Sequence, residues 1–165
     1  ESHASWLYPL LIYYFFAIDA GEKPLEQLIS TFGYRFLCEA GFAPLLEQEV
    51  DSGDSIDETK IATGKYVYSR PRGALVLRDQ AAPYGRIEMS TSLWQVLRYL
   101  KTAPVTQLFN TTMNESLIQQ LWFFVNPILE DQMEQPLRQL QLFNELKALE
   151  REAWALQKNK RNKDN

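Results

Sequence analysis

Apolar residues recur at helical spacing in five segments of the chain, and this pattern predicts a mainly α-helical fold, a helical bundle. Side chains three or four residues apart lie on one face of a helix, so each segment can bury an apolar stripe against its neighbours. The first segment is apolar nearly all round, which is typical of a helix that is buried on most sides or has lost a covering partner. The five segments span residues 6–18, 24–37, 92–100, 115–129 and 136–149.

Capping and helix-breaking residues indicate where some of these helices begin and end. Ser92 with Gln95, and Thr112 with Glu115, form capping-box patterns in front of the third and fourth segments. Pro127 lies inside the apolar pattern of the fourth segment. Because proline lacks an N–H and its ring clashes with the preceding turn, we expect a kink or a break in the helix there.

Between the second and third helical segments the pattern changes twice. Residues 47–63 are polar and rich in Asp and Glu, which predicts an acidic loop. After them, Tyr66 and Tyr68 alternate with other residues, and Leu75 and Leu77 do the same beyond an Arg-Pro-Arg-Gly turn. This alternation predicts a small β-hairpin inserted into the helical bundle.

The composition agrees with one domain and a short tail. The chain has 165 residues, 45% of them hydrophobic, which suffices for a buried core without disulfides or metals. We expect a helical domain over residues 1–156, with the β insert at about 65–80, and a basic, disordered tail over residues 157–165. The net charge of −4 argues against a broad phosphate-binding face, although the tail could touch nucleic acid or an acidic partner.

Candidate catalytic groups are few. The single cysteine, Cys38, lies among apolar residues of the second helical segment and is expected to be a buried, inert thiol. The single histidine, His3, has no neighbours that would orient it, and the acidic loop lacks the Asp/Asn ladder of a calcium loop. We therefore expect no enzymatic activity, no metal and no cofactor. A hydrolase that uses Cys38 or the acidic loop is the weakest of the hypotheses.

Nothing in the sequence indicates a membrane protein. The most apolar run, residues 10–18, has nine residues, whereas a spanning helix needs about 20. No positive charge precedes this run, so it does not resemble a signal peptide, and a cytoplasmic location is expected. Because the chain begins with Glu1 rather than methionine, we expect a processed chain or, preferably, a piece of a longer protein.

One surface pattern could bind single-stranded nucleic acid. Tyr66 and Tyr68 are flanked by Arg70 and Arg72, and aromatic rings beside cations can form a stacking platform for bases. Two aromatic residues at this spacing are also typical of one face of a hairpin that packs on a helix. Both interpretations stay open at the level of the sequence.

Residues 24–53 resemble a stretch of the bacterial recombination-mediator protein RecO. In that family a helix leads into a G-[FY]-A-P-x-L signature, and residues 41–46, GFAPLL, fit it as they stand. The order and spacing of further features extend the resemblance over roughly residues 7–150. These features are a short β insert at 66–77, helices at 87–100 and 115–130, and a Gln-Pro-Leu-Arg-Gln element at 135–139.

The chain departs from the family pattern at its zinc site and at its N-terminal end. Many members bind zinc through two Cys-x-x-Cys pairs, but here those positions hold Glu49 and Ser52, then Leu77 and Gln80. We therefore expect no zinc. Family members also begin with a DNA-binding OB fold, to which nothing here is similar. The resemblance thus implies the C-terminal helical part of such a protein, or a relative without the barrel.

The resemblance implies a non-catalytic mediator of DNA recombination and repair. Its partners would be the acidic, Phe-ended tail of single-strand-binding protein, a RecR-like protein and single-stranded DNA. Such a tail needs basic groups for its carboxylates and an apolar pocket for its ring. Our candidates are Arg35, Arg98 and Arg138 for the charges, with Phe42 and Leu46 as pocket lining.

A second hypothesis belongs to a different class of protein. The nearly all-apolar segment at residues 6–18 would suit a helical adaptor, or a subunit of a larger assembly unrelated to DNA repair, because such a surface favours a neighbour. Burial of that helix within one chain would weaken this hypothesis.

Overall fold

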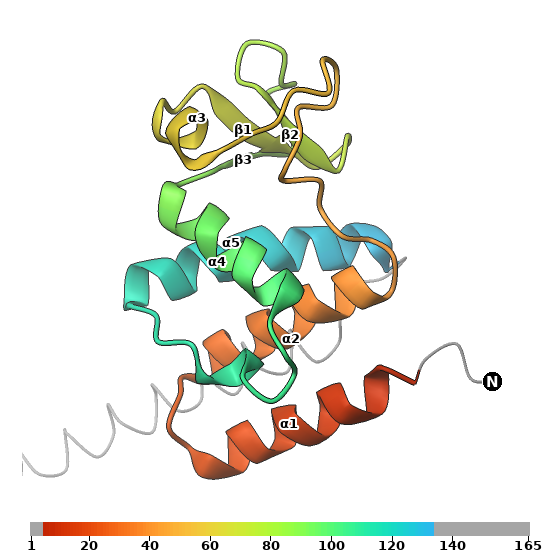
Figure 1. The fold of residues 1–165 in the computed structure, drawn as a ribbon, viewed down its shortest axis with the longest axis vertical. Helices are drawn as coiled ribbons and strands as arrows, with labels where there is room; N and C mark the ends of the chain where they lie inside the picture. Colours follow the sequence, from red (N-terminus) through yellow and green to blue (C-terminus); the bar gives the residue numbers. More distant parts are fainter. Residues whose placement is uncertain (1–4, 134–165) are drawn as a thin grey trace, which may run out of the picture. The chain divides into compact units, whose positions relative to one another are not determined.

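The computed structural model describes residues 5–133, and those up to Leu129 belong to one compact unit. The fold is mainly α-helical with a small antiparallel sheet, as predicted (Figure 1). The predicted segment 136–149, the tail at 157–165 and the candidate Arg138 lie outside the described residues. The long helices are α1 (Leu7–Ala20), α2 (Leu25–Glu39), α4 (Thr91–Thr102) and α5 (Glu115–Gln132). The short elements are α3 (Glu58–Ala62), β1 (Tyr66–Ser69), β2 (Ala74–Leu77), β3 (Arg86–Glu88) and the 3₁₀ helix η1 (Leu108–Asn110).

Helix α2 is the central helix of the bundle, with α1 on one side of it and α5 on another (Figure 1). Towards α1, the Phe32 ring lies 4.8 Å from that of Tyr14, measured between centroids. Towards α5, Gly33 lets the two helices approach closely. A Cβ added at Gly33 would lie 2.8 Å from Leu129 Cδ1 and 3.2 Å from Val125 Cγ1. The helix therefore packs on two faces, whereas its sequence predicts one apolar stripe.

The predicted hairpin is confirmed, and it carries a third strand. Strand β1 pairs antiparallel with β2, with Tyr66 opposite Leu77, and also with β3, with Tyr68 opposite Ile87. The sheet order is β2-β1-β3. The sequence did not predict β3, because three residues are too few to show alternation and the resemblance places Ile87 in the following helix. That helix, α4, begins only at Thr91.

The predicted acidic loop at residues 47–63 contains a short helix, α3. Asp57 caps it by accepting a hydrogen bond from Lys60 N at 2.9 Å. Two apolar side chains, Ile56 and Ile61, are buried on either side of the cap. The loop prediction was therefore wrong for residues 58–62. One aspartate cap and two apolar residues are too weak a pattern to indicate a helix in a polar segment.

Both long helices after the sheet begin at other capping residues than predicted. Ser90 Oγ accepts from Leu93 N at 3.1 Å, and Asn114 Oδ1 accepts from Leu117 N at 2.9 Å. Ser92 and Thr112 are therefore not the caps. Ser, Thr and Asn are all favoured N-cap residues, and each segment holds several of them close together. The sequence therefore does not show which of them caps the helix.

Helix α5 runs through Pro127 without a division, so a break at this proline was the wrong expectation. An interior proline costs about 3 kcal/mol. On both sides of it, however, α5 buries side chains in the core, among them Phe124, Val125, Ile128 and Leu129. This packing keeps the helix continuous.

Helix α1 is not buried on most sides. Leu10 is its one buried residue, while Tyr8, Phe15 and Phe16 are 58–73% exposed. Of the two interpretations of its apolar pattern, the structure agrees with an uncovered helix. None of the helices within residues 5–133 has the length and apolar character that a bilayer span requires.

Candidate interaction surface

Arg35 lies on α2 and closes the C-terminal end of α4. Its Nη1 donates to the carbonyl oxygens of Leu100 at 3.1 Å, Lys101 at 2.8 Å and Ala103 at 3.0 Å. Its Nε donates to Glu39 at 2.8 Å. The side chain is 15% exposed. Arg35 therefore serves the fold, because a cation at a helix C-terminus is favoured by the helix dipole and supplies donors to the last carbonyls.

Arg98 lies on the exposed side of α4 and stacks on an aromatic ring. Its guanidinium carbon is 4.6 Å from the centre of the Trp94 ring. The Trp94 indole is itself fixed, because it is 3% exposed and its Nε1 donates to the Leu46 carbonyl at 2.9 Å. Within the described residues no ion pair with a carboxylate is found for Arg98. The structure thus brings Arg98, Trp94 and Leu46 together.

The two candidate pocket residues differ in exposure. Phe42 follows the C-terminus of α2, where Gly41 adopts a φ of 89° and Phe42 N donates to Leu37 O at 2.8 Å. Its ring is 50% exposed. Leu46 is 1% exposed and contributes to the core. Phe42 can therefore contact a partner, whereas the Leu46 side chain is already covered.

The tyrosines and arginines proposed for nucleic-acid stacking do not form a surface platform. The Tyr68 ring is 2% exposed and packs against Phe124, with 4.8 Å between ring centroids. Tyr66 is only partly exposed. Arg70 Nη2 donates to the Pro127 carbonyl at 3.3 Å. Of the two interpretations of this pattern, the geometry agrees with a hairpin face packed on a helix.

Arg72, at the β1–β2 turn, is paired with the acidic segment. Its Nη1 donates to Asp51 Oδ2 at 2.7 Å, and this hydrogen bond lowers the pKa of Asp51 below its usual value. Both side chains are exposed. The charge of Arg72 is therefore matched within the chain, which makes it a weak candidate for binding phosphate.

The structure also describes Cys38 and the positions that hold zinc in other family members. Cys38 is half-buried, and burial raises the pKa of its thiol, which disfavours the nucleophilic thiolate. No group of three or more His, Cys, Asp or Glu side chains between residues 5 and 133 is placed to hold a metal ion. At the place of the family's first cysteine pair, Glu49 is 5% exposed and its Oε2 accepts from Ser52 N at 3.0 Å.

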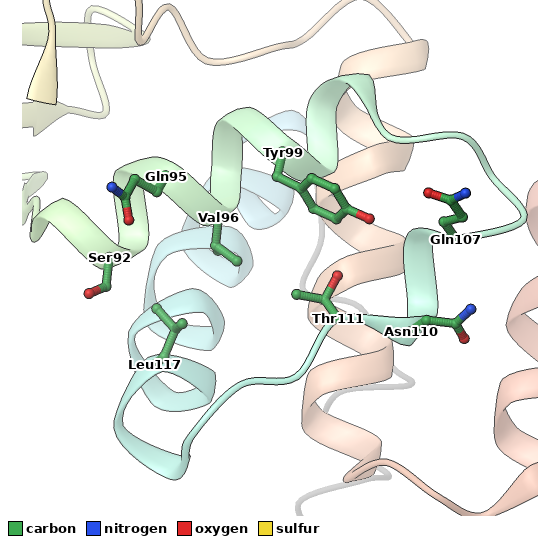
Figure 2. A pocket seen from close by; sticks show the side chains of 8 residues that line it. All are labelled: Ser92, Gln95, Val96, Tyr99, Gln107, Asn110, Thr111 and Leu117. Atoms are coloured by element: carbon green, nitrogen blue, oxygen red, sulfur yellow. The ribbon is translucent and has the colours of Figure 1, made fainter.

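A groove beside α4 is a feature that the sequence did not indicate (Figure 2). Its volume is about 670 Å³, and it is open to solvent. No motif could have revealed it, because its residues come from three separate segments and are all uncharged. The lining residues are Ser92, Gln95, Val96, Tyr99, Gln107, Asn110, Thr111 and Leu117.

The described residues thus define a helical domain with a three-stranded β insert. The family model described as "Recombination protein O C terminal" matches residues 2–141. The chain belongs to this family, and it is a RecO-like domain of DNA recombination and repair. The resemblance seen in the sequence is therefore confirmed. No curated protein and no solved structure gives a significant match to the chain.

Proposed function

We propose that this domain is a non-catalytic protein-interaction module of a cytoplasmic recombination mediator, and that Arg98 receives the acidic tail of a single-strand-binding protein. The observation that carries the proposal is the stack of Arg98 on Trp94. A guanidinium held over a ring keeps its N–H donors free for carboxylates. The fixed indole limits the conformations that Arg98 samples, so less entropy is lost when an acidic peptide binds.

The other arginines support this choice by elimination. Arg35 serves the carbonyls of α4, and Arg72 is paired with Asp51. Arg98 is therefore an exposed candidate cation for which no carboxylate partner is found among the described residues. The half-exposed ring of Phe42 is the apolar contact that we assign to the terminal phenylalanine of the tail. A RecR-like protein is the second partner that family membership favours.

Single-stranded DNA binding is not part of the proposal, because the ring of Tyr68 is buried and Arg72 is paired. The alternative function, a helical adaptor in a larger assembly, is favoured by a different observation. Tyr8, Phe15 and Phe16 are largely exposed on α1, and such a surface is typical of a helix that meets another protein.

A titration tests the proposed tail site. A fluorescein-labelled peptide that ends in Asp-Ile-Pro-Phe should bind the full chain in fluorescence anisotropy, and Arg98→Ala should weaken binding about tenfold, as for a lost charge-assisted contact. Lys65→Ala removes an exposed charge from the β insert and is the matched control. Absence of binding at high micromolar peptide, or equal loss in both variants, would refute the tail site.

A further inference from the structure

We propose that Lys101 is a second cation of the acidic-tail site, and that the Glu47 carboxylate occupies it until a bound peptide takes its place. This inference rests on the proposed function, because it concerns the regulation of the site around Arg98. It goes beyond that function by giving the chain an internal competitor for its own ligand. The observation that carries it is the ion pair between Lys101 Nζ and Glu47 Oε1, at 2.9 Å.

One face of α4 carries both cations. Trp94, Arg98 and Lys101 are spaced by four and then three residues, so they lie on the same face of the helix. Arg98 and Lys101 are separated by about 4.5 Å along the helix axis, at roughly 1.5 Å per residue. The tail peptide offers two carboxylates, the side chain of its aspartate and its C-terminus. One peptide can therefore form charge-assisted hydrogen bonds with both cations.

The segment that follows α2 runs along this face of α4. Trp94 Nε1 donates to the Leu46 carbonyl at 2.9 Å. The next residue, Glu47, reaches Lys101. Its backbone is also held from the acidic segment, because Ile56 N donates to the Glu47 carbonyl at 2.9 Å. The Glu47 carboxylate is therefore held where a peptide bound at the neighbouring arginine would place a second negative charge.

The ion pair can open without a movement of the backbone. The side chains of Lys101 and Glu47 are 33% and 37% exposed, so solvent and a ligand reach both. An ion pair with this exposure changes an equilibrium constant by no more than about fivefold, because water screens it. Rotation of two side chains is sufficient to exchange one carboxylate for another.

The charge of the surrounding segment agrees with this competition. Residues 47–60 hold six Asp and Glu residues and one Lys, so the segment and the acidic tail attract the same kind of group. Asp51 of this segment is paired with Arg72 at the β1–β2 turn, whereas Glu47 is paired with α4. Glu47 is thus the acid of this segment that we assign as the competitor.

Fluorescence anisotropy of the full chain with the labelled Asp-Ile-Pro-Phe peptide tests the proposal. We expect Glu47→Gln to tighten binding about two- to fivefold, because Lys101 is then available to the peptide. Lys101→Ala should weaken binding about fivefold. In a chain that carries Lys101→Ala, the gain from Glu47→Gln should fall below about twofold. Asp54→Asn removes the same charge from an exposed position of the same segment and is the matched control.

A gain in affinity separates competition from a structural role, because a variant that only destabilises the fold would bind the peptide less tightly. Unchanged or weaker binding in Glu47→Gln would overturn the inference. So would an equal gain in Asp54→Asn, since net charge alone would then explain it. In both cases the tail site stands if Arg98→Ala still weakens binding. Absence of peptide binding, or binding that Arg98→Ala does not affect, would overturn the tail site and this inference with it.

Discussion

Replacing Arg35 by methionine tests whether this arginine holds α4 to α2. The Leu100 carbonyl would ordinarily accept from the N–H four residues later, but that residue is Pro104, which has none. Arg35 Nη1 supplies a donor to it and also bonds the carbonyls of Lys101 and Ala103. Methionine keeps the apolar stem of the side chain and removes every donor.

The magnitude follows from these contacts. Hydrogen bonds to charged groups contribute about 1.5–3 kcal/mol each. One nitrogen with two hydrogens serves three carbonyls, so two full bonds are the upper limit. Water reaches part of the site, since the side chain is 15% exposed. We therefore expect Arg35→Met to lower the free energy of unfolding by about 3 kcal/mol. Arg35→Lys, which keeps the charge, should recover about half of this.

Urea denaturation of the full chain, followed by far-UV circular dichroism, measures this difference if the m-value stays constant. Glu39→Gln is the control, because an ion pair between residues four apart on a helix contributes only about 0.3–0.5 kcal/mol. A loss below about 0.5 kcal/mol in Arg35→Met would refute the reasoning. So would an equal loss in Glu39→Gln, since the surface pair would then carry the effect.

Three further predictions concern packing and charge. Tyr34→Phe should change the free energy of unfolding by less than about 1 kcal/mol and can be stabilising, because the buried Tyr34 hydroxyl makes no hydrogen bond of good geometry; a larger loss in urea denaturation would contradict this. Gly33→Val should cost about 2 kcal/mol or more, because even a Cβ would lie 2.8 Å from Leu129 Cδ1; an unchanged denaturation midpoint would disagree. Arg72→Gln should raise the pKa of Asp51 towards its usual value, as read from an NMR titration of the carboxyl carbon. Because the folded-state pKa of Asp51 is lowered, the pair favours the folded chain above the usual aspartate pKa of about 3.9, and this contribution is lost as pH falls through the lowered value.

The helices could be predicted because their signal is local. The apolar spacing of residues 6–18 and 115–129 found α1 and α5 to within a few residues. The capping residues could not be chosen correctly, because Ser90 and Asn114 compete with equally suitable neighbours. The hydrogen bonds that Leu93 N and Leu117 N donate to these side chains show which residue caps each helix.

The candidate site was harder to predict because its contacts are distant in the sequence. Arg35 was a reasonable candidate because it is charged. Its donors, however, bind backbone carbonyls at least 65 residues away in the sequence, so its charge stabilises the fold. The stack of Arg98 on Trp94 joins residues four apart on one helix, a spacing that the sequence does display. The groove residues are uncharged and come from separate segments, so no pattern in the sequence identified them.

The β insert shows what holds this part of the family fold when the zinc cysteines are absent. Three ion pairs lie in or beside this insert, namely Arg72–Asp51, Arg78–Glu88 and Lys101–Glu47. Each is at least one-third exposed, and exposed pairs contribute only about 0–1 kcal/mol. By contrast, burying one large apolar side chain contributes about 1.5–3 kcal/mol. The insert and the acidic segment before it bury Ile56, Ile61, Val67, Tyr68, Leu75 and Val76. Apolar packing therefore contributes more to the stability of this part of the fold than the ion pairs do.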